Sequence, residues 1–247
     1  MTRKLCTMAM FFLAFIVLSA NDIPSRLTDL PCAQNFDGPD FPADWTQTTT
    51  VGPLDRWVPY NSNFVGGDPH ELHCDMTPGA GITRLISPQM NTAGSDEIIV
   101  QFLHAIGFYD LGLVFKLQYS HDLVTWHDTD WSSSYTGYNQ GGHVSVLIAN
   151  LDAPATYVAW TLEGDQMGME GATLDNIRIH LRETPEAQIS GDGWLSWDAI
   201  PHANGYDIYS ADDPTGEFGY ETTVSGDNVW QTDLNQTKKF YRVKAVY

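Results

Sequence analysis

The sequence predicts an all-β chain built as two antiparallel β-sandwiches in succession. Three observations support this: apolar and polar residues alternate in short runs, β-branched and aromatic residues fill those runs, and Gly, Asp, Asn or Pro separate them. The clearest runs are EIIVQFLHAI (97–106), LGLVFKLQYS (111–120) and HVSVLIANL (143–151). Almost no segment after the first 20 residues has the 3.6-residue period of a helix, so we expect strands and turns throughout.

A module boundary is predicted at RETPEAQISGDG, where Pro185 and a polar stretch follow a strand-like run. The preceding part, residues 33–182, has a length at which one sandwich buries an adequate core. The following part, residues 186–247, is small, and we expect it to lean on its neighbour.

Residues 1–20 have the layout of a secretory signal peptide. Arg3 and Lys4 precede an apolar run from about Leu5 to Ala20, and either Val17-Leu18-Ser19 or Leu18-Ser19-Ala20 is suited to be the cleavage tripeptide. The run is shorter than a typical membrane span, so a retained anchor is the weaker alternative. The sequence therefore predicts a secreted or cell-surface protein with cleavage near residue 20.

The chain is strongly acidic, with 31 Asp and Glu against 12 Lys and Arg. Removal of Arg3 and Lys4 with the signal leaves 10 basic residues and a formal charge of −21. Such a surface repels phosphate backbones and anionic headgroups, which argues against nucleic-acid binding and direct membrane binding. Much of this acidity is also explained by solubility alone.

The stretch HELHC (70–74) resembles a zinc site at first sight. A zinc peptidase needs His-Glu-x-x-His on a helix, whereas His70 and His73 are three residues apart and the flanks GGDP and DMTPG break helices. We therefore expect His70, Glu71 and His73 to be solvated residues at a loop or strand end.

Two cysteines remain once Cys6 leaves with the signal. Because an exported protein meets an oxidising environment, we predict a disulfide between Cys32 and Cys74, with two buried free thiols as the alternative.

Four motifs of the first part occur in the order typical of one family: FDGPDFPADW (36–45), RLISPQMN (84–91), LQYSHDLVTWHDT (117–129) and GATLDNIRIHL (171–181). Together they resemble the MAM-like jelly-roll family, known in bacteria as the cleaved-adhesin or choice-of-anchor J type. The resemblance implies a jelly roll whose first and last strands are neighbours. One departure is the turn SHDLVTW, which lacks the glycine usual before Thr-Trp.

The same resemblance implies a structural Ca²⁺ held by Asp37 and Asp175, one near each of those neighbouring strands. Because Ca²⁺ takes 6–8 oxygen ligands, backbone carbonyls and a further carboxylate such as Asp68 or Asp40 would complete the site. The alternative is that Asp37 and Asp175 cap turns through local hydrogen bonds.

The second part is similar to a fibronectin type III module, an immunoglobulin-like sandwich. The residues that carry this likeness are GWLSW (193–197), PHANGYDIY (201–209) and FYRVKAVY (240–247). Trp197 would be the core tryptophan, and the hydroxyl of Tyr241 would tie back to the backbone.

A ligand platform is predicted in WHDTDWSSSYTGYNQGGH (126–143), where rings alternate with short polar groups. The candidate ligand-binding residues are Trp131, Tyr135, Tyr138, Asn139 and Gln140. Rings beside amides bind sugar faces and hydroxyls, although such rings also commonly cover a sandwich edge.

The sequence contains no nucleophile elbow, phosphate-binding loop or dinucleotide fingerprint, so we predict a protein that is not an enzyme. The economical interpretation is a binding or adhesion protein that engages an extracellular glycan or protein, with the second module as spacer or docking face. Accessory modules of a secreted hydrolase and a structural component of a surface layer or matrix are the alternatives.

Overall fold

The computed structural model describes residues 30–136, 140–201, 203–232 and 239–247, and nearly all regular structure in them is β-strand. The strands of the first module are β1 (Cys32–Gln34), β2 (Thr46–Thr49), β3 (Trp57–Tyr60), β4 (Glu71–Asp75), β5 (Ala80–Ile86), β6 (Glu97–Phe108), β7 (Leu113–Ser120), β8 (His127–Ser134), β9 (Gln140–Ala149), β10 (Tyr157–Asp165) and β11 (Met169–Leu181). A short 3₁₀ helix, η1 (Gln166–Gly168), links the last two. The second module contains β12 (Ala187–Ile189), β13 (Trp194–Trp197), β14 (Gly205–Ala211), β15 (Gly219–Ser225), β16 (Val229–Gln231) and β17 (Phe240–Val246).

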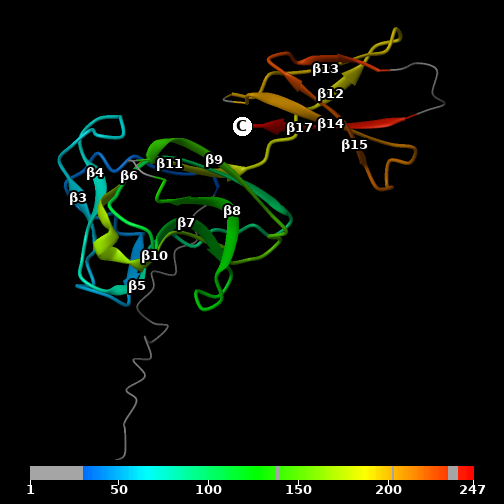
Figure 1. Cartoon of the computed structure of the whole chain (residues 1–247). Coiled ribbons are helices and arrows are strands. Elements are labelled where there is room, and N and C mark those ends of the chain that lie inside the picture. The colour runs from blue at the N-terminus through cyan, green and yellow to red at the C-terminus, as the bar shows by residue number, and fades with distance from the viewer. Residues whose placement is uncertain (1–29, 137–139, 202, 233–238) are drawn as a thin grey trace, which may run out of the picture.

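The first module is a sandwich of two antiparallel sheets (Figure 1). One sheet has the order β3-β4-β11-β6-β9, with β1 also paired to β11, and the other has the order β2-β5-β10-β7-β8. The predicted antiparallel all-β fold is confirmed. In the described residues no helix is long and apolar enough to cross a membrane, and the predicted signal peptide lies outside those residues.

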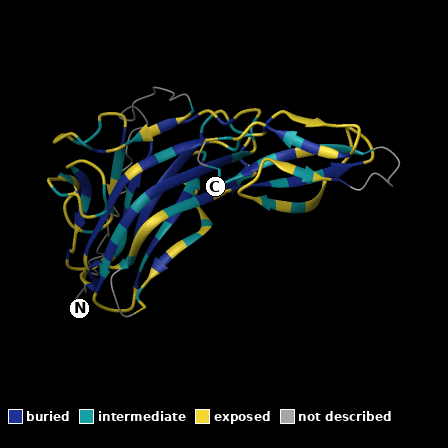
Figure 2. Ribbon diagram, turned by 90° about the horizontal axis from the view of Figure 1, so that it is seen from above, coloured by how far each residue is buried: buried dark blue, intermediate teal, exposed yellow. Residues whose placement is uncertain are grey.

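Alternate residues of each strand point between the two sheets and form one core. Phe102 of β6 meets Trp160 of β10 edge to face, with ring centroids 5.6 Å apart. Both side chains are fully buried, and burying a ring such as Phe102 contributes roughly 1.5–3 kcal/mol. Figure 2 shows the result, with buried strands in the interior and exposed loops at the ends.

The first and last strands of this module are neighbours, as the family resemblance implied, and their arrangement rules out the predicted disulfide. Cys32 of β1 lies opposite Ile179, and Cys74 of β4 lies opposite Ala172, on the same edge of β11. Seven positions along one strand separate them by about 20 Å, whereas the Cα atoms of a disulfide lie within about 7 Å. The disulfide prediction is therefore wrong, and both cysteines are buried free thiols.

The turn between β7 and β8 does without the glycine that the family pattern has. Leu123 takes the left-handed conformation there, with φ of 62°. The carboxylate of Asp122 accepts hydrogen bonds from the backbone N–H groups of Val124 (2.9 Å) and Thr125 (2.7 Å). The hydrogen bonds to Asp122 therefore stabilise a turn that more commonly contains a glycine.

The second module is a smaller sandwich of two three-stranded sheets, β12-β13-β16 and β15-β14-β17. Trp197 is buried in its core against Tyr206, with ring centroids 5.2 Å apart, as predicted. The hydroxyl of Tyr241 differs from the expectation, because it bonds to the hydroxyl of Thr232 rather than to the backbone.

The junction of the modules lies at the start of β6. Lys244 of β17 donates to Glu97 of β6 at 2.7 Å, and the N–H of Ala245 donates to the carbonyl of Glu183 at 3.0 Å. The other end of β6, at Phe108, therefore lies at the far end of the first module (Figure 1).

Candidate functional site: a groove on the outer face of one sheet

A groove of about 620 Å³ crosses the outer face of the sheet that contains β3, β4, β11 and β6. Its position follows from strand alternation. Leu72 and Cys74 of β4 and Leu174 of β11 are buried in the core, so the residues between them face outward.

Two cross-strand rows make the floor. In one row His73 lies opposite Thr173, which lies opposite Ala105. In the next row Asp75 lies opposite Gly171, which lies opposite Gly107. Ala105, Gly107 and Gly171 have little or no side chain. The surface of the sheet is therefore recessed along these two rows, which leaves room for a ligand.

The ring of His73 lies in the middle of the groove and is held on both sides. Its Nδ1 is 3.0 Å from Thr173 Oγ1, and its Nε2 is 3.1 Å from Asp75 Oδ1. A Cβ at Gly171 would come within 2.6 Å of the ring, so only glycine lets the imidazole lie flat across β11. Tyr60 packs beside it, with ring centroids 5.4 Å apart.

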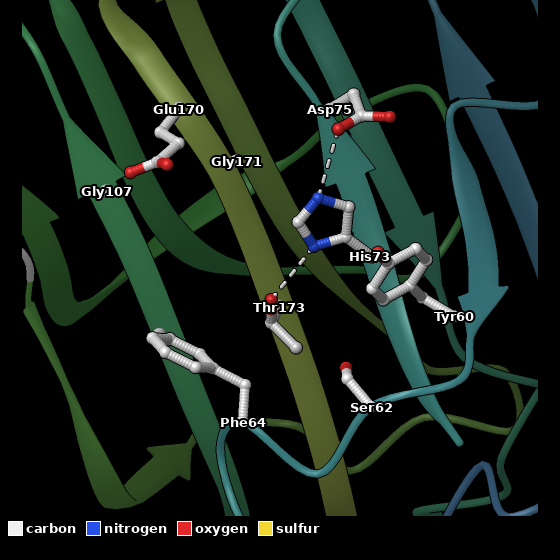
Figure 3. Close-up of a pocket in the computed structure, with 10 residues that line it drawn as sticks. Tyr60, Ser62, Phe64, His73, Asp75, Gly107, Glu170, Gly171 and Thr173 are labelled. Atoms are coloured by element: carbon white, nitrogen blue, oxygen red, sulfur yellow. Dashed lines mark hydrogen bonds and ion pairs between the residues drawn. The ribbon is translucent and has the colours of Figure 1, made fainter. Parts of the chain in front are cut away.

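The two ends of the groove differ in chemistry, as Figure 3 shows. Tyr60 and Phe64 stand near one end, and their side chains are exposed at 57% and 71%. Asp75 and Glu170 stand at the other end, on either side of Gly171 in that view. No Lys or Arg is among the described residues that line the groove, so its field is negative.

Beneath the Phe64 end, the loop between β3 and β4 covers a buried glutamate. Glu71 is fully buried, and its carboxylate accepts hydrogen bonds from Ser62 Oγ and from the N–H of Val65, both at 2.7 Å. The expectation that Glu71 would be solvated is wrong, because this loop folds over the outer face of β4. His73 is also partly buried, whereas it was expected to be solvated.

Asp175 of β11 lies under the same loop. One of its oxygens accepts from the N–H of Asn176 at 2.7 Å, while Oδ2 is buried without a hydrogen-bond partner. Burial first, and then the negative charges of Glu71 and Asp37, raise the pKa of Asp175 to about 7, although the hydrogen bond from Asn176 acts in the opposite direction. A Cβ at Gly67 would come within 2.8 Å of Oδ2, so the loop backbone approaches this carboxylate closely.

The chemistry of this carboxylate fits a cation. A buried carboxylate oxygen without a hydrogen-bond partner, in the field of two further carboxylates, is stabilised when a cation binds beside it. Asp37, Glu71 and Asp175 nevertheless do not form a finished ligand set, because no three His, Cys, Asp or Glu side chains of the described residues are arranged to hold a metal ion. Glu71, which the sequence did not nominate as a ligand, is one of the two carboxylates whose negative charge acts on Asp175.

The two rings of the predicted ligand platform that the structure describes pack against the core of the first module. The ring of Trp131 lies perpendicular to Phe102 and Phe115, with centroids 4.9 and 5.4 Å apart, and Tyr135 packs against the same core. Both rings are partly exposed and help to cover the edge of the sandwich, and their role in ligand binding stays a prediction.

Of the remaining platform residues, the structure describes Gln140. Gln140 is bonded within its own hairpin, because its Nε2 donates to the carbonyl of Ser134 at 2.9 Å and its Oε1 accepts from Ser133 Oγ at 2.8 Å. Tyr138 and Asn139 lie outside the described residues.

The groove residues were missed in the sequence, although one signal was present. The segment YNSNF (60–64) places two rings among short polar side chains, the same pattern that nominated residues 126–143. Register across β4, β11 and β6 brings His73, Asp75 and Glu170 to these rings, and no local pattern contains that information.

No family model and no curated protein matches the sequence. Among solved structures, the chain is similar to the K1 cleaved adhesin domain of Lys-gingipain from Porphyromonas gingivalis W83, with 13% identity, a TM-score of 0.46, and coverage of 62% of this chain and 99% of that one. It is also similar to TmCBM61 in complex with β-1,4-galactotriose (12% identity, TM-score 0.42, coverage 60% and 94%) and to the mannan-recognising carbohydrate-binding module TmCBM27 (13%, 0.39, 62% and 98%). At such low identities and scores, the groove is assigned on its own geometry and charges.

Proposed function

We propose that this chain is an exported, non-catalytic binding protein whose first module holds an uncharged glycan in the groove. The observation that carries the proposal is the combination of the exposed rings of Tyr60 and Phe64 with a floor of small residues around His73. Rings bind the apolar faces of sugars, and the hydroxyl, imidazole and carboxylate groups beside them bind sugar hydroxyls. The volume of the groove lies within the range of small-ligand sites.

The charge of the groove selects among glycans. Asp75 and Glu170 line it and no described basic residue balances them there, so uronic acids and sulfated sugars are repelled. Neutral oligosaccharides meet no such repulsion.

The modules are proposed to be a MAM-like, cleaved-adhesin type jelly roll and a fibronectin type III module. The neighbouring first and last strands support the former, and the buried Trp197 between two three-stranded sheets supports the latter. In this proposal the second module is a spacer or docking face.

A structural Ca²⁺ held by Asp37 and Asp175 is part of the proposal, and the buried Oδ2 of Asp175, which has no hydrogen-bond partner, supports it. When bound, it would neutralise these carboxylates beside the loop that carries Phe64. We expect CaCl₂ to raise the thermal unfolding midpoint of the full chain above its value in EGTA, and Asp175→Asn to abolish the difference, with Asp212→Asn, an exposed acid of the second module, as the control. An unfolding midpoint that Ca²⁺ does not change would contradict this site.

The glycan proposal is tested by titration calorimetry of the full chain with neutral galactan, mannan, xylan and glucan oligosaccharides and with oligogalacturonate. We expect at least one neutral oligosaccharide to bind, and Tyr60→Ala with Phe64→Ala to weaken it by about tenfold or more. Val124→Ala, an exposed apolar residue on the β7–β8 turn, is the matched control. Asp75→Asn with Glu170→Gln is expected to relieve the discrimination against oligogalacturonate.

Two outcomes would overturn the proposal: no binding of any neutral oligosaccharide at millimolar concentration, or equal binding by the wild type and the ring variant. Cleavage of an oligosaccharide during the titration would contradict the non-catalytic assignment.

A further inference from the structure

Large apolar side chains gather on the loops at the end of the first module that is remote from the second module. They are Leu54, Met76, Tyr109, Leu111 and Met167. Leu54 and Leu111 are exposed at 78% and 72%, and the other three at 46–57%. We call this end, made of residues 51–56, 75–79, 109–112 and 165–168, the apolar tip. Single exposed apolar residues are ordinary, but five on adjoining loops indicate an interaction surface.

Backbone hydrogen bonds hold these loops to one another. The N–H of Thr77 donates to the carbonyl of Gln166 (3.3 Å), and the N–H of Gln166 donates to the carbonyl of Gly79 (3.1 Å). The N–H of Tyr109 donates to the carbonyl of Gly168 (2.7 Å). The loops that carry Met76, Tyr109 and Met167 are therefore neighbours in space.

A buried arginine ties the loop that carries Leu54 to the other loops of the tip. Arg56 is 6% exposed, and its guanidinium donates to the carbonyl of Asp75 and, at 3.2 Å, to Gln166 Oε1. Gln166 Nε2 in turn donates to Thr83 Oγ1 at 2.9 Å. The apolar side chains thus stand on a preorganised platform, which lowers the entropy lost when a partner binds.

The tip faces away from the second module. β6 runs from Glu97, which accepts from Lys244 of the second module, to Phe108, which directly precedes Tyr109. Twelve strand residues span roughly 40 Å. Figure 1 shows these loops at the end of the first module that lies away from β12–β17. The tip is therefore open to a partner while the second module is anchored elsewhere.

The charges of the tip identify the kind of partner. Exposed acids lie on the same loops, namely Asp55, Asp75, Asp110 and Asp165. The one basic residue on these loops, Arg56, is buried and bonded. A second copy of this chain would bring the same acids into contact, and an anionic membrane would be repelled. An apolar surface ringed by acids fits a polypeptide that presents apolar side chains flanked by Lys or Arg.

We propose that the apolar tip is a docking surface for a partner polypeptide whose apolar contact residues are flanked by basic ones. This interaction uses the tip loops rather than the rings of the groove, and the two surfaces adjoin at Asp75. It would let the chain connect a glycan to a protein.

The test is a selection from a random peptide library displayed on phage against the immobilised full chain. Counter-selection uses the variant Leu111→Ser with Met167→Ser, whose changes are on exposed side chains and are expected to leave the thermal midpoint near that of the wild type. We expect enriched peptides to combine aromatic or aliphatic residues with Lys or Arg. One such peptide, made synthetically, should bind the wild type about tenfold or more tightly than the Ser variant. The variant Asp55→Asn with Asp110→Asn should weaken binding severalfold and flatten its dependence on salt.

Several results would overturn the proposal. They are a failure to enrich peptides over the Ser variant, enrichment of acidic peptides, and equal binding of the selected peptide to wild type and Ser variant. Cosedimentation of the wild type, but not of the Ser variant, with phosphatidylcholine vesicles would assign the tip to a lipid surface. A dimer that the Ser variant abolishes, seen by analytical ultracentrifugation, would assign it to a second copy.

Discussion

Arg182 and Asp207 form an ion pair across the junction of the two modules, with Arg182 Nη2 2.6 Å from Asp207 Oδ2. Arg182 Nε also donates to the carbonyl of Ala245 at 2.8 Å, and Nη1 lies 3.7 Å from Glu97 Oε2. The arginine side chain is only 7% exposed, so solvent screens these contacts weakly. One side chain thus joins the end of β11 to β14, β17 and the start of β6.

Replacing Arg182 by Ala should therefore loosen the junction. Removing one partner of a buried pair commonly costs 3–5 kcal/mol, but Glu97 keeps Lys244 and Asp207 keeps Thr223, so we expect a loss of about 2 kcal/mol. Urea denaturation of the full chain checks the value, and separation of one transition into two would show that the modules had uncoupled. Arg242→Ala, at an exposed cation stacked on Phe218, is the control; an equal loss there would contradict a special role for Arg182.

Gly171→Ala should damage the groove without removing any lining side chain. The added Cβ would come within 2.6 Å of the His73 ring, so the ring must leave β11 and give up its contacts with Thr173 and Asp75. We expect the affinity for the neutral oligosaccharide to fall by about tenfold while the fold persists. Gly191→Ala, where a Cβ meets open space, should change neither property. Unchanged glycan affinity in Gly171→Ala would show that His73 does not position the ligand.

The two thiols should be present but unreactive in the native protein. Burial raises the pKa of both Cys32 and Cys74, that of Cys74 to about 12, so little thiolate exists at neutral pH. We expect thiol reagents to label neither residue in buffer and both in urea, in each case without reductant. Labelling in urea only after a reductant is added would show that the two cysteines form a disulfide, against the strand register.

The β7–β8 turn should give the stability of the fold an acid-sensitive component. The backbone N–H groups of Thr125 and Val124 bond to the charged form of Asp122 and lower its pKa to about 2. Because the folded pKa lies below the unfolded value of about 4, this contribution is complete above pH 4 and is lost as the pH falls toward 2.

The variant Asp122→Ala measures this contribution. The difference in urea midpoint between wild type and Asp122→Ala should be large at pH 7 and shrink toward pH 2. Val124→Ala, in the same turn, adds and removes no charge, and its effect should not follow this course. A difference that is constant with pH would mean that Asp122 does not act through its charge.

The strands and the cores followed from local pattern. Alternation in 97–106 and 111–120 predicted β6 and β7, and the likeness around Trp197 correctly placed that ring in the second core. Alternation predicts strands because successive side chains point to the core and to the outer face in turn, whichever strands lie beside them. The resemblance also implied that the first and last strands are neighbours, and β1 does pair with β11, although β1 lies ahead of the motif at 36–45 in which the first strand was expected.

The failures share one physical cause, which is that they depend on which strand lies beside which. Cys32 and Cys74 are both next to β11, yet seven positions of register separate them. Glu71 has the sequence surroundings of a solvated residue and is buried only because a loop folds over it. Whether Trp131 binds a ligand stays a prediction, but its contacts with Phe102 and Phe115 of other strands likewise could not be seen in its local sequence.

The sequence by itself thus determined an antiparallel β protein with an acidic surface and an inward or outward side for most strand residues, because these depend on composition and on a period of two. Only the tertiary structure decided that His73, Asp75 and Glu170 share a groove with Tyr60 and Phe64, and that five apolar side chains share one tip. The groove and the tip depend on strand register and on loop contacts between segments that are far apart in the chain. No local stretch of sequence shows which of these segments become neighbours.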